Sequence, residues 1–297
     1  MRHIFIVNTY AGKATAEAAI KELLVGFGEY ELYLTKGPKD ATEYVREVCN
    51  NKREDEEIRF YACGGDGTLK EVCDGAYGYD GVDITVVPLG SGNDFVRYYG
   101  GEEKFLDLCA LRDAESEYID LIRVNGELCI NVCNFGFESS AANMMSKVRH
   151  KKIIGGKNSY ITGILYAIIY SMKSYGRICC DGEEITDGAY ILCSVANGRY
   201  VGGGFKCAPL SINNDGMLDV CAVSPISRFT LARLIGVYKS GDHITDKRFE
   251  KIIKYRRCKK VEVHAEDEFI IAIDGEIIHT NDLTCEVVPH AIRFAHL

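Results

Sequence analysis

The sequence predicts an α/β domain built on a mostly parallel sheet, followed by a strand-rich second domain. Up to about residue 120, short apolar runs typical of buried strands alternate with segments of helical periodicity. After that point short strand-like runs dominate. The chain has 297 residues; at about 150 residues per domain this length also favours two domains.

The first part contains four expected strands and three expected helices. The strands are Ile4–Val7, Tyr30–Leu34, Ile58–Ala62 and Ile84–Val87. The helices are Ala14–Gly28, Asp40–Asn50 and Thr68–Ala76. This alternation favours a parallel sheet covered by helices, in which ligands bind at the carboxyl ends of the strands.

The second part is expected to hold seven short strands and two helices. The strands are Tyr118–Val124, Leu128–Asn134, Ala189–Ala196, Met217–Val223, Val261–His264, Phe269–Ile273 and Thr284–Val288. The helices are Tyr160–Ser174 and Arg228–Ser240. The change of pattern predicts domains at 1–120 and 121–297, with the option that the last few residues pack back on the first domain.

Charge is distributed unevenly along the chain. Residues 1–120 carry 24 acidic and 13 basic side chains, and the remainder carries 19 acidic and 22 basic ones. The overall net charge of −8 argues against nucleic acid as a partner, because that binding is dominated by phosphate neutralisation. Two basic runs, Lys147–Lys157 and Lys247–Lys260, are candidates for contact with a membrane surface; solvated loops or strand edges are the alternative.

The thirteen cysteines include no CxxC pair, so the pattern favours buried free thiols in a reducing cytoplasm. The apolar run Ile161–Met172 is shorter than the ~20 residues that a membrane-spanning helix needs. We therefore expect a cytoplasmic protein that touches membrane only at its inner surface.

Two glycine-bearing loops follow neighbouring strands. Gly64-Gly65-Asp66-Gly67-Thr68 joins a strand to a helix, where backbone amides can bind phosphate. Asp66 would repel a bare phosphate, so it is expected to act through a metal or a hydroxyl, or to cap the helix. The second loop, Pro88–Phe95, has the sequence PLGSGNDF. Each loop alone could be a structural turn, but two at adjacent strand ends indicate a binding site.

These loops resemble motifs of the diacylglycerol kinase catalytic-domain family of lipid kinases. Gly64–Thr68 with Glu71 matches GGDGTxxE, and Pro88–Phe95 matches PLGTGNDF with Ser91 in place of threonine. Further similarities run over nearly the whole chain. They are Asn8, Thr35 with Gly37 and Asp40-Ala41, Asn134–Phe137, Asp215–Asp219 and Asp274–Glu276. Thr9 departs from the family's proline.

The resemblance implies a phosphofructokinase- or NAD kinase-like nucleotide-binding α/β domain and a β-sandwich lipid-binding domain, with the active site in the cleft. It implies ATP and Mg²⁺ as cofactors and phosphoryl transfer to a lipid hydroxyl, with diacylglycerol as the first choice of acceptor. The expected nucleotide-binding residues are Asn8, Thr35, Gly64, Gly65, Gly67, Thr68, Glu71, Ser91, Gly92 and Asn93.

The resemblance also implies the catalytic residues. Asp66 and Asp94 would hold or orient hydrated magnesium, and Glu276 would be the general base that takes the proton of the lipid hydroxyl. From local sequence alone, Asp274-Gly275 favours a plain hairpin turn. Asp215 and the Met217 carbonyl are expected ligands of a structural magnesium ion, with a solvated hairpin as the alternative.

Other functions stay open at this point. Phosphatidylglycerol, sphingosine or undecaprenol could be the acceptor, and an NAD kinase-like phosphotransferase is an alternative activity. A non-catalytic nucleotide-binding regulator is disfavoured because Asp66, Asp94 and Glu276 are all present. The sequence leaves the oligomeric state open, a homodimer included.

Overall fold

The computed structural model describes residues 1–9, 16–136 and 173–297. The basic run Lys147–Lys157 and most of the expected helix Tyr160–Ser174 lie outside the described residues. The described chain forms two compact units. The first unit comprises Met1–Leu121 and Pro289–Leu297, and the second comprises Ile122–Val288.

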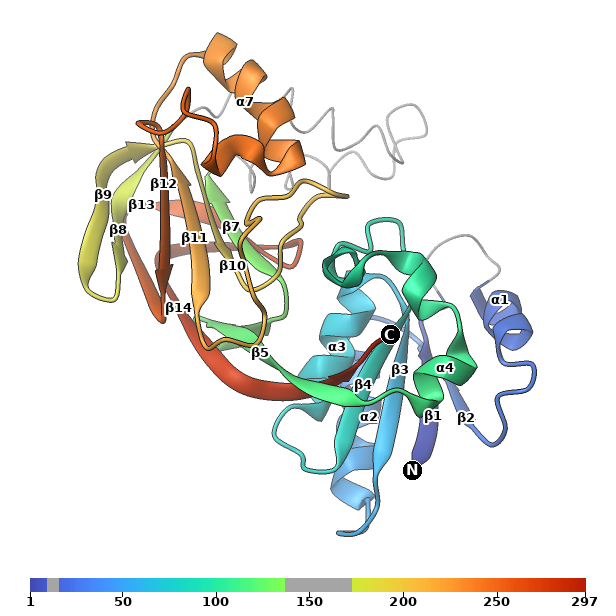
Figure 1. The fold of residues 1–297 in the computed structure, drawn as a ribbon. Helices are drawn as coiled ribbons and strands as arrows, with labels where there is room; N and C mark the ends of the chain where they lie inside the picture. The colour runs from blue at the N-terminus through green and yellow to red at the C-terminus, as the bar shows by residue number, and fades with distance from the viewer. Residues whose placement is uncertain (10–15, 137–172) are drawn as a thin grey trace. The chain divides into compact units, whose positions relative to one another are not determined.

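A parallel sheet forms the centre of the first unit (Figure 1). Its strands are β1 (Arg2–Val7), β2 (Glu31–Leu34), β3 (Ile58–Gly64), β4 (Val82–Pro88) and the last part of β14 (Glu276–Ala295). Their order is β14-β4-β3-β1-β2. The strands β3 and β4 are buried at every position, which explains why their sequences are mostly apolar and do not alternate with solvent-facing residues.

Helices cover this sheet. They are α1 (Ala16–Leu23), α2 (Asp40–Asn51), α3 (Asp66–Ala76) and α4 (Leu108–Asp113), with the short 3₁₀ turns η1 (Phe95–Tyr99) and η2 (Glu102–Phe105). Gly75 lets α2 and α3 approach, because a Cβ atom there would lie 2.7 Å from the Cβ of Val45. This packing fixes α3 and therefore the loop that precedes it.

A buried ion pair connects β3 to β4, and Arg293 extends it to β14. Arg59 and Asp83 are 3% and 1% exposed, and Arg59 Nη2 donates to Asp83 Oδ2 at 3.0 Å. Asp83 also accepts a hydrogen bond from Ser116 Oγ (2.6 Å) and pairs with Arg293 of β14 (3.1 Å). Because Arg59 and Asp83 are almost completely buried, removal of Asp83 would leave the Arg59 guanidinium as an uncompensated buried charge.

The second unit is an antiparallel β-sandwich-like domain (Figure 1). Its main strand order is β12-β11-β10-β7-β13-β14. The strands are β6 (Glu127–Cys129), β7 (Val132–Gly136), β8 (Ser174–Cys180), β9 (Glu183–Tyr190), β10 (Leu192–Ala196), β11 (Leu218–Val223), β12 (Ile253–Cys258) and β13 (Lys260–Ile273). Both β5 (Ser116–Val124) and β14 run from one unit into the other.

One long strand links the two layers of this sandwich. The first half of β13 pairs with β8 and its second half pairs with β7. The pairing register of β13 with β14 shifts between His264 and Phe269, which allows the strand to change layers. A core that includes Phe135, Ile178 and Val195 fills the space between the layers.

A helix covers the outer face of the β7-β10-β11-β12 layer. This helix, α7 (Arg228–Ser240), is followed by the 3₁₀ turn η3 (Asp242–Ile244). Leu231, Leu234 and Tyr238 of α7 pack into a second core with residues of β10 and β11. Both faces of this layer are thus buried, so β10 and β11 are buried at every position.

Several expected elements differ in the structure. The run Leu128–Asn134 is two strands, because the amides of Ile130 and Asn131 bond to a side chain instead of a neighbouring strand. Ala189–Ala196 likewise divides into β9 and β10. The expected end of the helix Tyr160–Ser174 is wrong, since Ser174 begins β8.

All thirteen cysteines are free thiols, and eleven of them are buried. No helix among the described residues is long and apolar enough to cross a membrane.

Candidate functional site

The two glycine-bearing loops lie against each other at the carboxyl ends of β3 and β4. The carbonyl oxygen of Gly64 accepts hydrogen bonds from the amides of Leu89 (2.9 Å) and Gly90 (3.2 Å). A Cβ atom on Gly90 would lie 2.4 Å from the Cα atom of Gly65. Glycine at position 90 is therefore required by a direct backbone-to-backbone approach.

Asp66 joins the first loop to the second. Its Oδ2 accepts the amide of Asp94 and its Oδ1 accepts the amide of Phe95, both at 3.0 Å. Sequence alone suggested a metal, a hydroxyl contact or a cap on its own helix, and a metal or hydroxyl contact stays a prediction. In the structure the carboxylate accepts two consecutive amides at the end of the second loop. Asp66 thus holds the two loops in one arrangement.

Asn8 is connected to the start of α3. Its amide donates to the carbonyl of Cys63 at 3.0 Å, and its side-chain Nδ2 donates to Thr68 Oγ1 at 2.9 Å. A Cβ atom on Gly64 would lie 2.2 Å from the same Thr68 oxygen. Gly64 therefore makes room for the hydroxyl that Asn8 contacts.

The second loop is also held from within. Asn93 has a φ of 49°, in the left-handed region that asparagine tolerates better than most residues. Its Nδ2 donates to the Gly90 carbonyl at 3.0 Å and to Glu102 Oε1 at 3.1 Å. Asp94 is 7% exposed, and Arg97 Nε lies 3.4 Å from its Oδ1.

The remaining expected nucleotide residues belong to the same unit. Thr35 is buried just after β2, with its amide bonded to the carbonyl of Val7 at 2.9 Å. Glu71 lies on α3, where its carbonyl accepts the hydroxyl of Thr42. Ser91 is exposed on the second loop. The structure thus gathers Asn8, Thr35 and both glycine loops at the carboxyl edge of one parallel sheet, where α/β proteins bind ligands.

Glu276 belongs to the second unit and is exposed. It pairs with Ile273 at the end of the β13–β14 hairpin. The two residues between them, Asp274 and Gly275, have φ values of 48° and 92°. These values match the tight hairpin turn that local sequence favours.

The sequence placed Asp274 in a hairpin turn but predicted none of the contacts of its carboxylate. Its carboxylate accepts the amides of Ile130 (2.7 Å), Asn131 (3.0 Å) and Val132 (3.1 Å), together with the Cys129 thiol (3.3 Å). Burial raises the pKa of Asp274 to about 6, against the opposing effect of these donors. The only sequence signal was the Asp-Gly pair, because the donors lie over 140 residues away.

At the expected structural metal site around Asp215, the carboxylates form ion pairs with an arginine. Arg257 contacts the carboxylate of Asp215, and its Nε lies 3.6 Å from Asp219 Oδ2. Asp215 also accepts the amide of Met217 at 3.1 Å. Within residues 1–9, 16–136 and 173–297, no cluster of three or more His, Cys, Asp or Glu side chains has a metal-binding arrangement. The assignment of Asp215 and Met217 to a metal stays a prediction.

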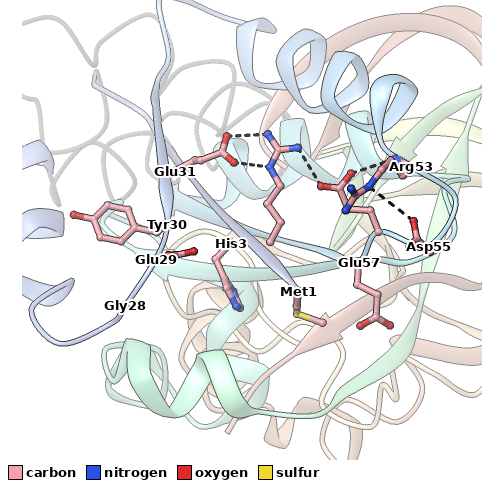
Figure 2. Close-up of a pocket in the computed structure, with 11 residues that line it drawn as sticks. Met1, His3, Gly28, Glu29, Tyr30, Glu31, Arg53, Asp55 and Glu57 are labelled. Carbon is pink, nitrogen blue, oxygen red and sulfur yellow. Dashed lines mark hydrogen bonds and ion pairs between the residues drawn. The ribbon is translucent and has the colours of Figure 1, made fainter.

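A pocket of about 730 Å³ lies at the other edge of the first unit's sheet. Its lining includes Met1–His3 at the start of β1, and Arg53 and Asp55–Glu57 before β3. Figure 2 shows Glu31 among the residues that line this pocket. The Nε and Nη2 atoms of Arg2 donate to the carboxylate of Glu31, and its Nη1 lies 3.6 Å from Glu56 Oε1. Since this pocket is at the amino ends of the strands, it is separate from the glycine loops.

Comparison with known proteins gives a consistent assignment for both units. Residues 2–124 match the family model of the diacylglycerol kinase catalytic domain. Residues 131–296 match the YegS C-terminal NAD kinase beta sandwich-like domain.

Curated relatives and solved structures extend this match. A probable lipid kinase YegS-like protein of Pseudomonas aeruginosa is 30% identical over 234 residues, covering 78% of this chain and 74% of the relative. One from Alcanivorax borkumensis is 27% identical, covering 86% and 82%. The crystal structure of a putative diacylglycerol kinase from Bacillus anthracis superposes with a TM-score of 0.78 at 24% identity, covering 100% of this chain and 97% of that one.

The fold expected from the sequence, an α/β domain followed by a β-sandwich-like domain, is confirmed by these matches. The chain belongs to the YegS-like family, which combines a diacylglycerol kinase catalytic domain with a YegS C-terminal domain.

Proposed function

We propose that this protein is an ATP-dependent lipid kinase that transfers the γ-phosphoryl group to a lipid hydroxyl, with diacylglycerol as the acceptor. The observation that carries the proposal is the Asp66 bridge, which holds two glycine loops together at the carboxyl edge of a parallel sheet. Phosphoryl transfer depends mainly on positioning and charge neutralisation, and a rigid double loop supports both.

The first turn of α3 would bind the phosphates of ATP. Gly65 is its N-cap and supplies no side chain, so the first amides of the helix face outward from an open cap. A Cβ atom on Gly67 would meet nothing within 4 Å. The glycine is therefore not needed for protein packing, which fits a site where a phosphate approaches the backbone closely.

Asp66 and Asp94 have the chemistry of a magnesium site. Their Oδ2 atoms lie 3.4 Å and 3.9 Å from the position of a Cβ on Gly92, so the two carboxylates flank one glycine. Mg²⁺ is usually bound through one or two carboxylates and waters. When bound, the ion would neutralise charge on the phosphates; the protein residues would orient it and keep the two loops in register.

Glu276 is proposed as the general base. It is exposed at the end of a hairpin whose turn is fixed by Asp274, so its backbone position is well defined while its carboxylate can reach a substrate. A carboxylate within hydrogen-bond distance of the lipid hydroxyl would take its proton as the oxygen attacks phosphorus.

The test is phosphate transfer from labelled ATP to a panel of lipids in mixed micelles, with and without Mg²⁺. The panel contains diacylglycerol, phosphatidylglycerol, sphingosine and undecaprenol, with NAD as a soluble acceptor. We expect Mg²⁺-dependent labelling of diacylglycerol. Labelling of another lipid would replace the acceptor, and labelling of NAD alone would overturn the proposal.

A further inference from the structure

The outer face of α7 is exposed and carries positive charge. Leu231, Leu234 and Tyr238 bury the inner face of the helix. On the outer side, Phe229 is 67% exposed, although aromatic side chains of this size are usually buried. The helix contains Arg228, Arg233 and Lys239 and no acidic residue.

These residues are arranged in a pattern. Successive helical residues turn by about 100°, so Phe229, Ala232 and Gly236 follow one another along the middle of the exposed face. Arg228 and Lys239 fall on one side of this strip, and Arg233 falls on the other. An uncharged strip between cationic borders is typical of a helix that lies on a bilayer surface.

Two cations of α7, Arg233 and Lys239, are available for an external anion. The Arg233 guanidinium lies 4.2 Å from the centre of the Phe229 ring, and Lys239 Nζ lies 5.7 Å from the centre of the Phe205 ring. Within the part of the chain that the structure describes, no carboxylate is at ion-pair distance from Arg233 or Lys239.

The neighbouring basic run Lys247–Lys260 differs in this respect. Arg248 is bonded to Asp246, and Lys254 Nζ donates to the carbonyl of Ile185 at 2.5 Å. Arg257 contacts Asp215 and Asp219. This run is richer in basic residues, but much of its charge is bonded to other residues of the protein. We therefore favour α7 as the segment that binds an anionic surface.

We propose that the outer face of α7 docks on a bilayer that contains anionic lipids, with Arg233 and Lys239 at the headgroups and Phe229 inserted between them. The proposal rests on the proposed lipid kinase function, which requires access to a substrate held in a membrane. Each cation near such a surface contributes roughly fivefold to the partition coefficient, and the acid-free helix adds no repulsion.

The test is co-sedimentation with vesicles of phosphatidylcholine alone and with 30% phosphatidylglycerol. The wild-type protein should bind the anionic vesicles and should not bind the vesicles of phosphatidylcholine alone. Its binding to the anionic vesicles should weaken as the salt concentration is raised. The double variant Arg233→Glu, Lys239→Glu should lower the partition coefficient at least about tenfold, and Phe229→Ala should lower it several-fold. All three side chains point away from the core, so these variants should unfold at the wild-type temperature.

The double variant Lys247→Glu, Lys251→Glu is the matched control, because both lysines are exposed and the change of charge is the same. An equal loss in the control, or unchanged binding in the α7 variant, would overturn the proposal. Stronger binding of single-stranded RNA than of anionic vesicles would overturn it as well, as would dimerisation that the α7 variant abolishes.

Phosphorylation of a short-chain, water-soluble diacylglycerol distinguishes a failure of the docking proposal from a failure of the proposed lipid kinase function. The α7 variant should retain wild-type turnover on the soluble substrate and lose turnover on vesicles. If no lipid is phosphorylated while the vesicle result holds, the proposed function fails and the docking surface stands.

Discussion

Each unit of the molecule contains an aspartate, followed by a glycine, whose carboxylate accepts consecutive backbone amides from another segment. Asp66 in the first unit accepts those of Asp94 and Phe95, 28 and 29 residues away. Asp274 in the second unit accepts those of Ile130, Asn131 and Val132, up to 144 residues away. Asp66 connects two loops that are close in the sequence, whereas Asp274 connects segments that are far apart in the sequence.

The difference lies in what each anchor serves. Asp66 is both the anchor and a proposed site residue, so a substitution there changes loop geometry and chemistry together. In the second unit the two roles are divided, because Asp274 anchors the turn and Glu276, two residues later, would perform the chemistry. A carboxylate in a glycine-rich motif can therefore be required for backbone order, for catalysis, or for both, and variants can separate these contributions.

The largest effect is expected for Glu276→Gln. Glutamine keeps the shape of the exposed side chain and cannot accept a proton, so turnover should fall by roughly 10²–10⁴-fold. The unfolding temperature should not change, because Glu276 is exposed and Asp274 still holds the turn. Steady-state kinetics with the best acceptor and a thermal melt check this. Near-wild-type turnover would remove Glu276 from the mechanism.

Asp66→Asn should lower activity and stability together. The asparagine Nδ2 would face a backbone N–H where an acceptor is needed, so the second loop should shift. A displacement of about 1 Å can cost on the order of 10²-fold in turnover, and an unpaired amide costs about 1–3 kcal/mol in free energy of unfolding.

Asp74→Asn is the control for Asp66→Asn. Asp74 lies on the same helix and pairs with Lys70 at 3.0 Å. It should change turnover little. Urea unfolding and initial rates are measured for both variants, and an equal effect at the two positions would contradict the special role of Asp66.

Two glycine substitutions should separate packing from ligand approach. Gly90→Ala forces a Cβ atom to 2.4 Å from the Gly65 backbone and should destabilise the protein by about 1–3 kcal/mol. Gly67→Ala meets no protein atom within 4 Å and should leave stability unchanged or slightly raised, while weakening nucleotide binding. Calorimetry of nucleotide binding and urea unfolding check the pair. Normal nucleotide affinity in Gly67→Ala would argue against phosphate at that turn.

The smallest expected effect is a pH dependence of stability at Asp274. Burial raises its pKa to about 6 in the folded protein, above the value near 4 of an unfolded chain. The folded state then binds more protons between these values, so the carboxyl group contributes stability as pH falls from about 7 to 4. The unfolding free energy of wild type minus that of Asp274→Asn should increase as the pH falls over that range. If this difference decreases instead, hydrogen bonds from the three amides lower the pKa of Asp274 more than burial raises it.

Local patterns predicted the first unit well. Apolar runs and glycine turns are properties of neighbouring residues, so the strands before Gly64 and Pro88 and the helix after Gly65 could be placed from sequence. The contact between the loops followed from the rule that parallel strands end at one edge. The bond from Asp66 to the amides of Asp94 and Phe95 could not be predicted, since it depends on the exact path of both loops.

The second unit was harder because its contacts are distant in sequence. The partners of Asp274 lie in a segment that resembles one continuous strand, and β13 resembles two strands because its middle is polar. The strand β12 was missed within Lys247–Lys260. Its period of two is present, with Ile253 and Tyr255 inward and Lys254 and Arg256 outward, but the density of basic residues obscured it.

The return of β14 to the first unit has a consequence for how the protein folds during synthesis. Arg293 and Phe294 pair with β4, and the carbonyl of Ala295 accepts the hydroxyl of Thr85. The ribosome makes these residues about 200 residues after β4, which at roughly 5–20 residues per second is a delay of ten seconds or more. Until then β4 is an open edge with unpaired backbone groups. We expect the nascent first unit to depend on a chaperone during that interval, and protease sensitivity of chains stalled before residue 289 measures it.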